Sequence, residues 1–296
     1  MRVFVLTTPA FDELENLPGQ LADLEAQELR PALWMVVDDG STDGTYEWAV
    51  EQAASRPWME VRRSPERSGE YLGGHIARIK RWGLEQVIAL ARERGVEPDA
   101  AGVLDADIRL PPEHYRLLLE ALEQDPRLGV VSSTMQAENE GATQKERLQR
   151  EDLPRGATQT FRMETLEQIG GLPPWPGFDG AANVKAKLLG WGTRRLPHVV
   201  ATHERLTATR FGVAQGYRRK GRYAYFLGHH PVLLMGRAAA YTLQAPHVGG
   251  IYFLRGWAGC KLRGEDRCPD EGVWNYYRNE RLREYLRRGV PRFVRK

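Results

Sequence analysis

Cysteine is scarce in this chain of 296 residues, which contains only Cys260 and Cys268. Two cysteines with no others around them do not make a zinc-binding set. The other features of the chain indicate an intracellular protein, in which a disulfide is not expected. We therefore interpret both cysteines as incidental to function.

Long hydrophobic runs are also missing. No stretch of about 18 apolar residues occurs, so no membrane-spanning helix is expected. The chain enters a strand-like run within residues 1–6, without the pattern of a signal-peptide cleavage site. Hydrophobic residues make up 42% of the chain, which is sufficient for a sizeable core. These features predict a cytoplasmic protein of the size of an enzyme.

Lysine is rare beside arginine, with 7 Lys and 35 Arg among the 42 basic residues and a net charge of +3. Arginine suits phosphate binding because its guanidinium is a planar, permanently charged fork. Genomic base composition or a thermophilic source also explains the excess, and we prefer this explanation for most of the arginines. No nucleic-acid partner is expected, because acids are interspersed among the basic residues and no zinc-finger, homeodomain or RNA-recognition pattern occurs.

Strand-like and helix-like segments alternate over residues 1–133. The strand-like runs are 3–8, 33–37, 59–62, 103–104 and 129–133, and the helix-like segments are 15–26, 45–54, 74–94 and 112–124. Such alternation predicts an α/β fold with a parallel sheet covered by helices on both faces. The strands are apolar throughout, as burial on both faces requires.

The rest of the chain is less regular. Residues 134–155 are polar and fit a long loop or a helix equally well. Residues 157–162 look like a strand, and 183–189 like a short helix that ends at Gly190. From residue 207 the chain becomes aromatic and rich in arginine, with helical segments expected at 217–237 and 238–262.

The most informative motif is Asp105-Ala106-Asp107, in residues 102–109, which read GVLDADIR. An apolar strand that ends in two carboxylates places hard oxygen ligands at the carboxyl edge of a sheet, where open α/β folds bind ligands. Carboxylates suit Mg²⁺ or Mn²⁺, which commonly bridge substrate phosphates. The pair alone is weak evidence, because such pairs are common in turns.

Three further segments strengthen this interpretation. Residues 7–13 read TTPAFDE and residues 37–45 read VDDGSTDGT, each at the end of a predicted strand, and residues 176–179 read PGFD. With Asp105-Ala106-Asp107, which follows Asp39 by 66 residues, these segments resemble the family 2 glycosyltransferases in order and spacing. The resemblance covers about the first 205 residues.

The resemblance implies a GT-A fold, a Rossmann-like and mostly parallel mixed sheet flanked by helices. Residues 1–133 would form the half that binds the nucleotide-sugar, and 134–206 the acceptor-side half with the catalytic base. Residues 207–296 would form a C-terminal helical extension.

The activity implied is transfer of a sugar from a nucleoside-diphosphate sugar to a hydroxyl acceptor, with inversion at the anomeric carbon and with Mn²⁺ or Mg²⁺. A UDP-sugar is the default donor, with GDP and dTDP sugars left open, and the acceptor is a glycan or a lipid-linked saccharide. Transfer of a single sugar is expected, because the Gln-x-x-Arg-Trp signature and the membrane helices of processive relatives are absent.

The resemblance also assigns roles by position. The residues implied to line the nucleotide site are Thr8, Pro9, Phe11, Glu13, Asp39 and Asp105. Asp39 would accept a hydrogen bond from the base; its other role, capping the turn at Gly40, fits Asp38 or Asp43 better. Asp107 would bind the metal directly, with Asp105 on the ribose and close to the ion. His203 is the third implied ligand, although a structural or surface role explains it equally well.

Asp179 is the implied catalytic base, and a turn residue before Gly180 is the alternative. An apolar wall would raise its pKa toward a useful value, and the expected wall residues are Trp175, Pro176, Phe178 and Trp191. Two positions depart from the family pattern. Asp12 stands where asparagine is common, and Phe178 stands where a second acid often precedes the base.

Residues 207–296 carry the least recognisable signal. Basic residues beside aromatic and aliphatic ones, at 218–227 and 281–296, fit peripheral contact with the inner face of an anionic membrane or an amphipathic helical cover over the core. No feature of the sequence indicates an oligomeric state.

Two other functions fit the sequence less well. A sugar-phosphate nucleotidyltransferase would open with a Gly-rich, basic phosphate loop, which residues 9–16 lack. A non-catalytic nucleotide-sugar-binding protein is disfavoured by the joint presence of Asp39, Asp105, Asp107 and Asp179.

Overall fold

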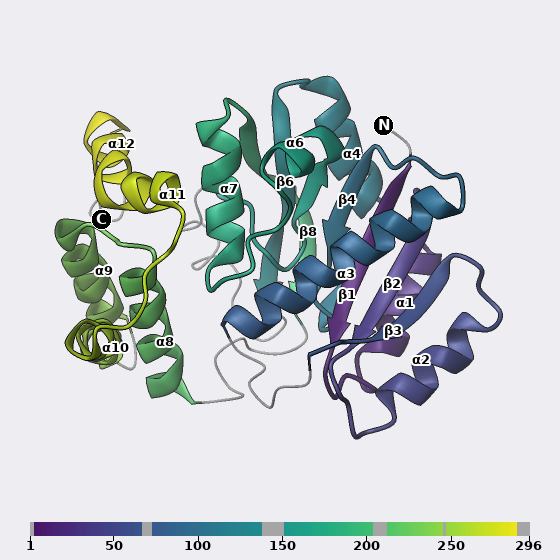
Figure 1. Cartoon of the computed structure of the whole chain (residues 1–296), viewed down its shortest axis with the longest axis horizontal. Coiled ribbons are helices and arrows are strands. Elements are labelled where there is room, and N and C mark those ends of the chain that lie inside the picture. Colours follow the sequence, from purple (N-terminus) through teal and green to yellow (C-terminus); the bar gives the residue numbers. More distant parts are fainter. Residues whose placement is uncertain (1–2, 67–72, 138–150, 204–211, 245–246, 289–296) are drawn as a thin grey trace. The chain divides into compact units, whose positions relative to one another are not determined.

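The chain divides into two compact units, Met1–Arg205 and Leu206–Lys296 (Figure 1). This computed structural model describes residues 3–66, 73–137, 151–203, 212–244 and 247–288. The first unit is an α/β domain and the second is helical. No helix in these described ranges is long and apolar enough to span a bilayer. The side chains of Cys260 and Cys268 are both buried.

The first unit is built on a mixed sheet of eight strands in the order β3-β2-β1-β4-β7-β6-β8-β5. The strands are β1 (Phe4–Ala10), β2 (Leu33–Asp38), β3 (Met59–Arg63), β4 (Ala100–Val103), β5 (Ile108–Arg109), β6 (Leu128–Ala137), β7 (Thr160–Arg162) and β8 (Gly192–His203). Strands β3, β2, β1 and β4 are mutually parallel. Strand β7 is antiparallel to both of its neighbours, and β5 is antiparallel to β8. The expected mostly parallel mixed sheet is therefore confirmed.

Alternate residues of the strands face two separate cores. On one face, Phe4, Leu6 and Trp34 pack against helices α1 (Leu17–Glu25), α2 (Thr45–Ala53) and α4 (His114–Gln124). On the other face, Val5 and Met35 pack against α3 (Gly74–Glu93), α6 (Met163–Gln168) and α7 (Phe178–Leu188). Figure 1 shows α3 crossing the face formed by β1 and β2. Burial on both faces explains why these strands are apolar throughout.

Two expectations in residues 134–206 need correction. Helix α7 begins at Phe178 rather than at residue 183, because Gly177 adopts φ 75° and starts the helix from a left-handed conformation. Strand β6 extends to Ala137, so the start of the segment expected to be a loop or helix is strand. Residues 138–150 of that segment lie outside the described residues.

The second unit contains helices α8 (Val213–Phe226), α9 (Pro231–Leu243), α10 (Gly249–Arg263), α11 (Glu271–Asn275), a π-helical turn (Tyr276–Glu280) and α12 (Arg281–Arg288). Two helical segments were expected between residues 217 and 262, but three are present, because Pro231 starts a new helix at its first turn. Helices α8 and α10 pack backbone to backbone: a Cβ on Gly221 would overlap the Phe253 carbonyl, and one on Gly256 would overlap the Arg218 carbonyl.

Candidate active site

The carboxyl ends of β1, β2 and β4 meet at one edge of the sheet. Ala10 is in register with Asp38, and Thr7 with Val103. The backbone N–H of Asp39 donates to the carbonyl of Ala10 at 2.8 Å. The parallel pairing therefore brings Thr8, Pro9, Asp39 and Asp105 to the same edge. Thr8 is fully buried there, and its Oγ1 accepts a hydrogen bond from the Trp34 indole at 2.9 Å.

The loops after β1 and β2 brace each other. The Asp12 N–H donates to Ser41 Oγ at 3.0 Å, and Asp12 Oδ1 accepts from the Thr42 N–H at 2.8 Å. The Glu13 N–H donates to Thr45 Oγ1 at 2.9 Å. Asp12 has φ 53°, a left-handed conformation that both Asp and Asn tolerate. This explains why aspartate can replace the asparagine common at this position.

Two other residues expected to line the nucleotide site lie in or beside the first of these loops. Glu13 is buried, and its carboxylate accepts a hydrogen bond from the Asn16 amide. Phe11 is partly exposed just after β1. Both therefore lie close to the edge at which Asp39 and Asp105 meet.

The Asp39 carboxylate is buried and bonded to His75, a residue of α3. His75 Nε2 lies 2.7 Å from Asp39 Oδ2, while Oδ1 is buried with no hydrogen-bond partner. Burial raises the pKa of Asp39 above its ordinary value of 3.8, although the hydrogen bond from His75 opposes this. The turn is capped by its neighbour, since Asp38 accepts from the N–H groups of Gly40 and Ser41. The unsatisfied Oδ1 can therefore accept a hydrogen bond from a ligand.

Asp105 is paired with a buried lysine. The Lys80 ammonium forms an ion pair with Asp105 Oδ1, donates to the Gly156 carbonyl at 3.1 Å and lies 4.8 Å from the centre of the Phe178 ring. The Gly156 N–H in turn lies 3.4 Å from Asp179 Oδ2. A continuous line of contacts thus connects Asp105, at the end of β4, to Asp179, in the first turn of α7.

Asp107 faces His203 across the pairing of β5 with β8. Ile108 is in register with His203, and this places His203 Nδ1 at 3.4 Å from Asp107 Oδ2. That nitrogen is buried without a hydrogen-bond partner. When two ligand atoms each lie about 2.1 Å from one ion, and the ligand–ion–ligand angle is a right angle, the two atoms are about 3.0 Å apart. The pair therefore fits two adjacent ligands of a divalent ion.

The expected set of three metal ligands is not assembled. Among the residues that the structure describes, no three His, Cys, Asp or Glu side chains are grouped so that they could hold a metal ion. Asp105 Oδ1 is instead paired with the Lys80 ammonium. An ion bound by Asp107 and His203 would complete its coordination with water and substrate oxygens, as Mg²⁺ commonly does.

The expected apolar wall around Asp179 is only partly present. Phe178 is adjacent in α7, and a Cβ on Gly156 would contact both Phe178 and Asp179. Trp191, in contrast, lies at the other end of α7, where its backbone N–H donates to the Ala186 carbonyl at 3.0 Å. The assignment of Trp191 to this wall is therefore wrong.

His75 and Lys80 were not identified from the sequence. A signal existed for Lys80, because it shares the spacing of Ala77, Leu84 and Val87 on the buried side of α3. A lysine within an apolar helical stripe requires a buried partner. The sequence pattern could not show that this partner is Asp105.

Comparisons with known proteins identify the family of the chain. The profile described as Glycosyl transferase family 2 matches residues 6–175. An undecaprenyl-phosphate mannosyltransferase of Micrococcus luteus is 37% identical over 122 residues, which amount to 41% of this chain and 44% of that protein. The chain thus matches less than half of that relative's length.

Two solved structures are similar over most of the chain. The mannosyltransferase PcManGT from Pyrobaculum calidifontis, in complex with GDP-Man and Mn²⁺, has a TM-score of 0.60 at 18% identity, covering 90% of this chain and 88% of that one. S. aureus TarS in complex with UDP-GlcNAc has a TM-score of 0.54 at 17% identity, covering 88% and 75%. At these identities the likeness shows the fold, which is GT-A. The profile covers more than half of the chain, so the protein belongs to glycosyl transferase family 2.

Proposed function

We propose that the enzyme transfers a single sugar from a nucleoside-diphosphate sugar to the hydroxyl group of a glycan or lipid-linked saccharide, with inversion. The observation that carries this proposal is the line of contacts from Asp105 through Lys80 and Gly156 to Asp179. It joins the donor-side carboxylates to a carboxylate on a separate helix, as a reaction between two bound substrates requires.

The donor would be held at the sheet edge. Asp39 Oδ1 is a buried acceptor available to an N–H group of the base, and the carboxylate of Asp105 would bind the ribose, oriented by Lys80. Uridine is our default base. A relative in complex with UDP-GlcNAc and another in complex with GDP-Man support testing both nucleotides.

Asp107 and His203 would hold the divalent ion. When bound, Mn²⁺ or Mg²⁺ supplies a Lewis acid for the negative charge that develops on the diphosphate. The pairing of Asp105 with Lys80 supports a division of labour in which Asp107 is the principal carboxylate ligand.

Asp179 would act as the general base. Its carboxylate takes the proton of the acceptor hydroxyl while the hydroxyl oxygen bonds to the anomeric carbon and the bond from that carbon to the diphosphate breaks. The products are the glycosylated acceptor, a protonated Asp179 and the nucleoside diphosphate. A single displacement of this kind inverts the anomeric configuration.

The first experiment measures the thermal shift with UDP, GDP and dTDP, each with and without Mn²⁺, because a ligand that binds the native state raises the melting temperature. We expect one nucleotide to stabilise the protein, and more strongly with the ion. If Asp107→Asn shows the same ion dependence as the parent, the metal assignment is wrong.

The second experiment compares Asp179→Asn with a matched control, Glu120→Gln, which changes a partly exposed acid that pairs with Arg116 within α4. Asp179→Asn should retain nucleotide binding and lose transfer by about 10²- to 10⁴-fold, and the control should behave as the parent. The acceptors tested are saccharides and lipid-linked saccharides, because their hydroxyl groups must lose a proton during transfer. Transfer at the parental rate by Asp179→Asn would exclude this residue as the base.

A further inference from the structure

Helix α9 exposes a continuous apolar stripe. Val232, Met235, Ala239 and Leu243 are all exposed, at 61% and 57% for the first two and 81% for the last. Their spacing of three or four residues places them within one face of the helix. The opposite face, with Leu234 and Ala238, packs in the core of the second unit beside Phe253 of α10. The stripe is therefore the outer surface of a well-packed helix.

Helix α10 also exposes apolar side chains. Ile251 and Leu262 are 55% and 88% exposed, and their separation of eleven residues places them on the same face, with the exposed Arg255 between them. Close packing at Gly250, whose Cβ would overlap the Ala238 carbonyl and Thr242 Oγ1, joins α10 firmly to α9. The two helices therefore pack directly against each other, and each exposes apolar side chains.

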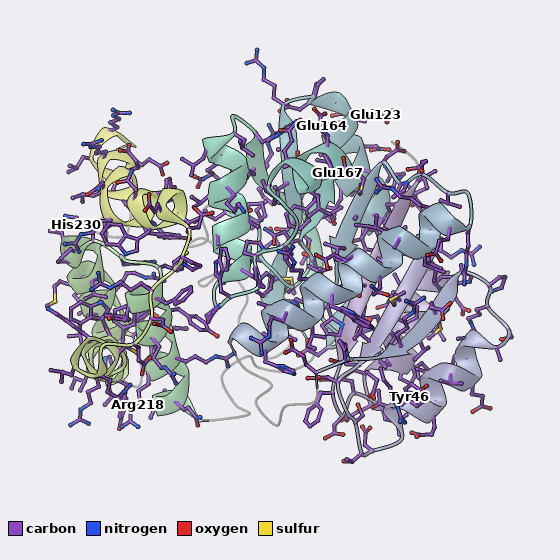
Figure 2. The ribbon with its side chains drawn as sticks, viewed as in Figure 1. Tyr46, Glu123, Glu164, Glu167, Arg218 and His230 are labelled. Carbon is purple, nitrogen blue, oxygen red and sulfur yellow. The ribbon has the colours of Figure 1, made fainter. Side chains whose placement is uncertain are left out.

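Basic residues predominate in this region, although Glu265, the residue directly after α10 and Gly264, pairs with Arg222 and Arg263. Residues 213–264 contain no Asp or Glu, and their eight basic residues are Arg218, Arg219, Lys220, Arg222, Arg237, Arg255, Lys261 and Arg263. Several basic side chains lie over aromatic rings: Arg218 is 5.3 Å from the Tyr252 ring centre and Lys261 is 5.3 Å from that of Trp257. Figure 2 shows Arg218 among the side chains of this unit. Residues 1–205 mix both signs, so the excess of basic residues belongs to the second unit, and α8, α9 and α10 carry no acid within it.

We propose that this surface, defined by Val232, Met235, Ala239, Leu243, Ile251 and Leu262 with the basic residues beside them, binds an anionic lipid bilayer. Exposed apolar side chains can enter the boundary between headgroups and acyl chains, and lysine and arginine contact the acidic headgroups. The complementarity of charge selects an anionic bilayer over a neutral one. This binding requires neither donor nor metal, so it is tested separately from sugar transfer.

The test is sedimentation of the full chain with vesicles. We compare mixed phosphatidylcholine and phosphatidylglycerol vesicles with vesicles of phosphatidylcholine alone, at low and high salt. We expect binding to the anionic vesicles that weakens with salt. The variant Val232→Ser/Met235→Ser/Leu243→Ser should bind about tenfold more weakly, because it removes three apolar contacts. Failure of the parent to bind anionic vesicles at low salt would overturn the proposal.

A matched control replaces three exposed apolar residues of the first unit, Val50, Leu188 and Leu189, by serine. This control should bind vesicles as the parent does. Circular dichroism and the melting temperature establish that both variants are folded. A second variant, Arg255→Gln/Lys261→Gln, should bind anionic vesicles more weakly than the parent does, and its binding should depend less on salt.

Two outcomes would assign the surface to another occupant. If the parent is a dimer and the stripe variant a monomer, with equal vesicle binding, the surface joins two copies of the chain. If the stripe variant melts at a lower temperature and vesicle binding is unchanged, the surface packs within the protein. Either result would overturn the lipid assignment.

Discussion

At the scale of the residue, two buried pairs control the carboxylates of the site. His75 bonds to Asp39, and Lys80 bonds to Asp105, and both partners come from α3. A buried carboxylate without such a partner would be costly to ionise. Helix α3 therefore orients side chains that lie at the ends of β2 and β4.

The pH dependence of nucleotide binding should report on Asp39. Because burial raises its pKa above 3.8 in the folded state, Asp39 becomes protonated at a higher pH than an ordinary aspartate. The ionised form is the stronger hydrogen-bond acceptor. Nucleotide affinity, measured by calorimetry, should therefore fall as the pH is lowered through this raised pKa.

Protein stability depends on the ionisation of Asp39 in the opposite direction from nucleotide affinity. The folded state holds the proton more tightly than the unfolded state, so this contribution is fully present below pH 3.8 and is lost as the pH rises through the folded-state pKa. Asp39→Asn should bind nucleotide weakly with little pH dependence in this window. It should also gain stability relative to the parent as the pH rises. An unchanged pH profile in Asp39→Asn would show that another group titrates.

Lys80 is expected to act as a positioning residue through Asp105. Lys80→Met should raise KM for the donor more than it lowers kcat, because the ribose-binding carboxylate loses its orientation. In a double-mutant cycle with Asp105→Asn, the coupling free energy should be on the order of 1 to 3 kcal/mol, as for charged hydrogen bonds. Lys80→Arg should restore part of the donor affinity if the charge matters. Additive effects in the cycle would contradict the role.

The sequence predicts Asp39, Asp105 and Asp107 from short motifs at strand ends, and Asp179 from a short motif that lies at the start of α7. Their partners could not be found, since an ion pair between Lys80 and Asp105 depends on how α3 lies across the sheet. The separation of Trp191 from Asp179 shows the same limit. A helix of 11 residues, α7, places residues near in sequence at opposite ends.

At the scale of the element, α3 approaches the sheet closely through a glycine. A Cβ on Gly83 would overlap Thr7 Oγ1 and lie 2.8 Å from Val37 Cγ2. Alanine favours helices by up to about 1 kcal/mol over glycine, but overpacking costs about 1 to 3 kcal/mol. The cost of the clash with β1 and β2 should exceed the gain in helix propensity.

Gly83→Ala should therefore lower the free energy of unfolding by about 1 to 2 kcal/mol, as measured by urea denaturation. It should also weaken nucleotide binding, because α3 carries His75 and Lys80. Gly236→Ala, in a helix with open space around this position, is the control and should be neutral or stabilising. Equal stability of the two variants would mean that α3 can shift without cost.

The parallel half of the sheet was predictable because its strands are continuously apolar and its helices have regular apolar spacing. Strand β8 was not predicted, because Arg194, Arg195 and His198 interrupt its apolar pattern. Strand β5 has only two residues, which is too short for any periodic signal. Yet the pairing of these two strands is what brings His203 to Asp107.

At the scale of the whole molecule, each unit has its own core. The second unit depends on the contact of α8 with α10 at Gly221. A Cβ at this position would lie 2.9 Å from the backbone nitrogen of Trp257 and overlap the Phe253 carbonyl. Gly221→Ala should destabilise this unit by about 1 to 3 kcal/mol, occasionally more, through overpacking. Gly216→Ala, on the same helix with open space, is the matched control.

Nucleotide binding should be retained in Gly221→Ala, because the proposed donor residues all belong to the first unit. In the same sample, the thermal shift with nucleotide reports on the first unit, and vesicle binding reports on the second. Loss of nucleotide binding in Gly221→Ala, with Gly216→Ala unaffected, would show that the units do not act independently.

The sheet of the first unit ends in strands that are poor templates for another chain. Strand β5 offers only two residues, and β3 carries Glu60, Arg62 and Arg63 among its five. Short or charged outer strands discourage edge-to-edge pairing between molecules. An enzyme concentrated on a surface would meet its own copies frequently, and these two borders would keep such encounters from growing into aggregates.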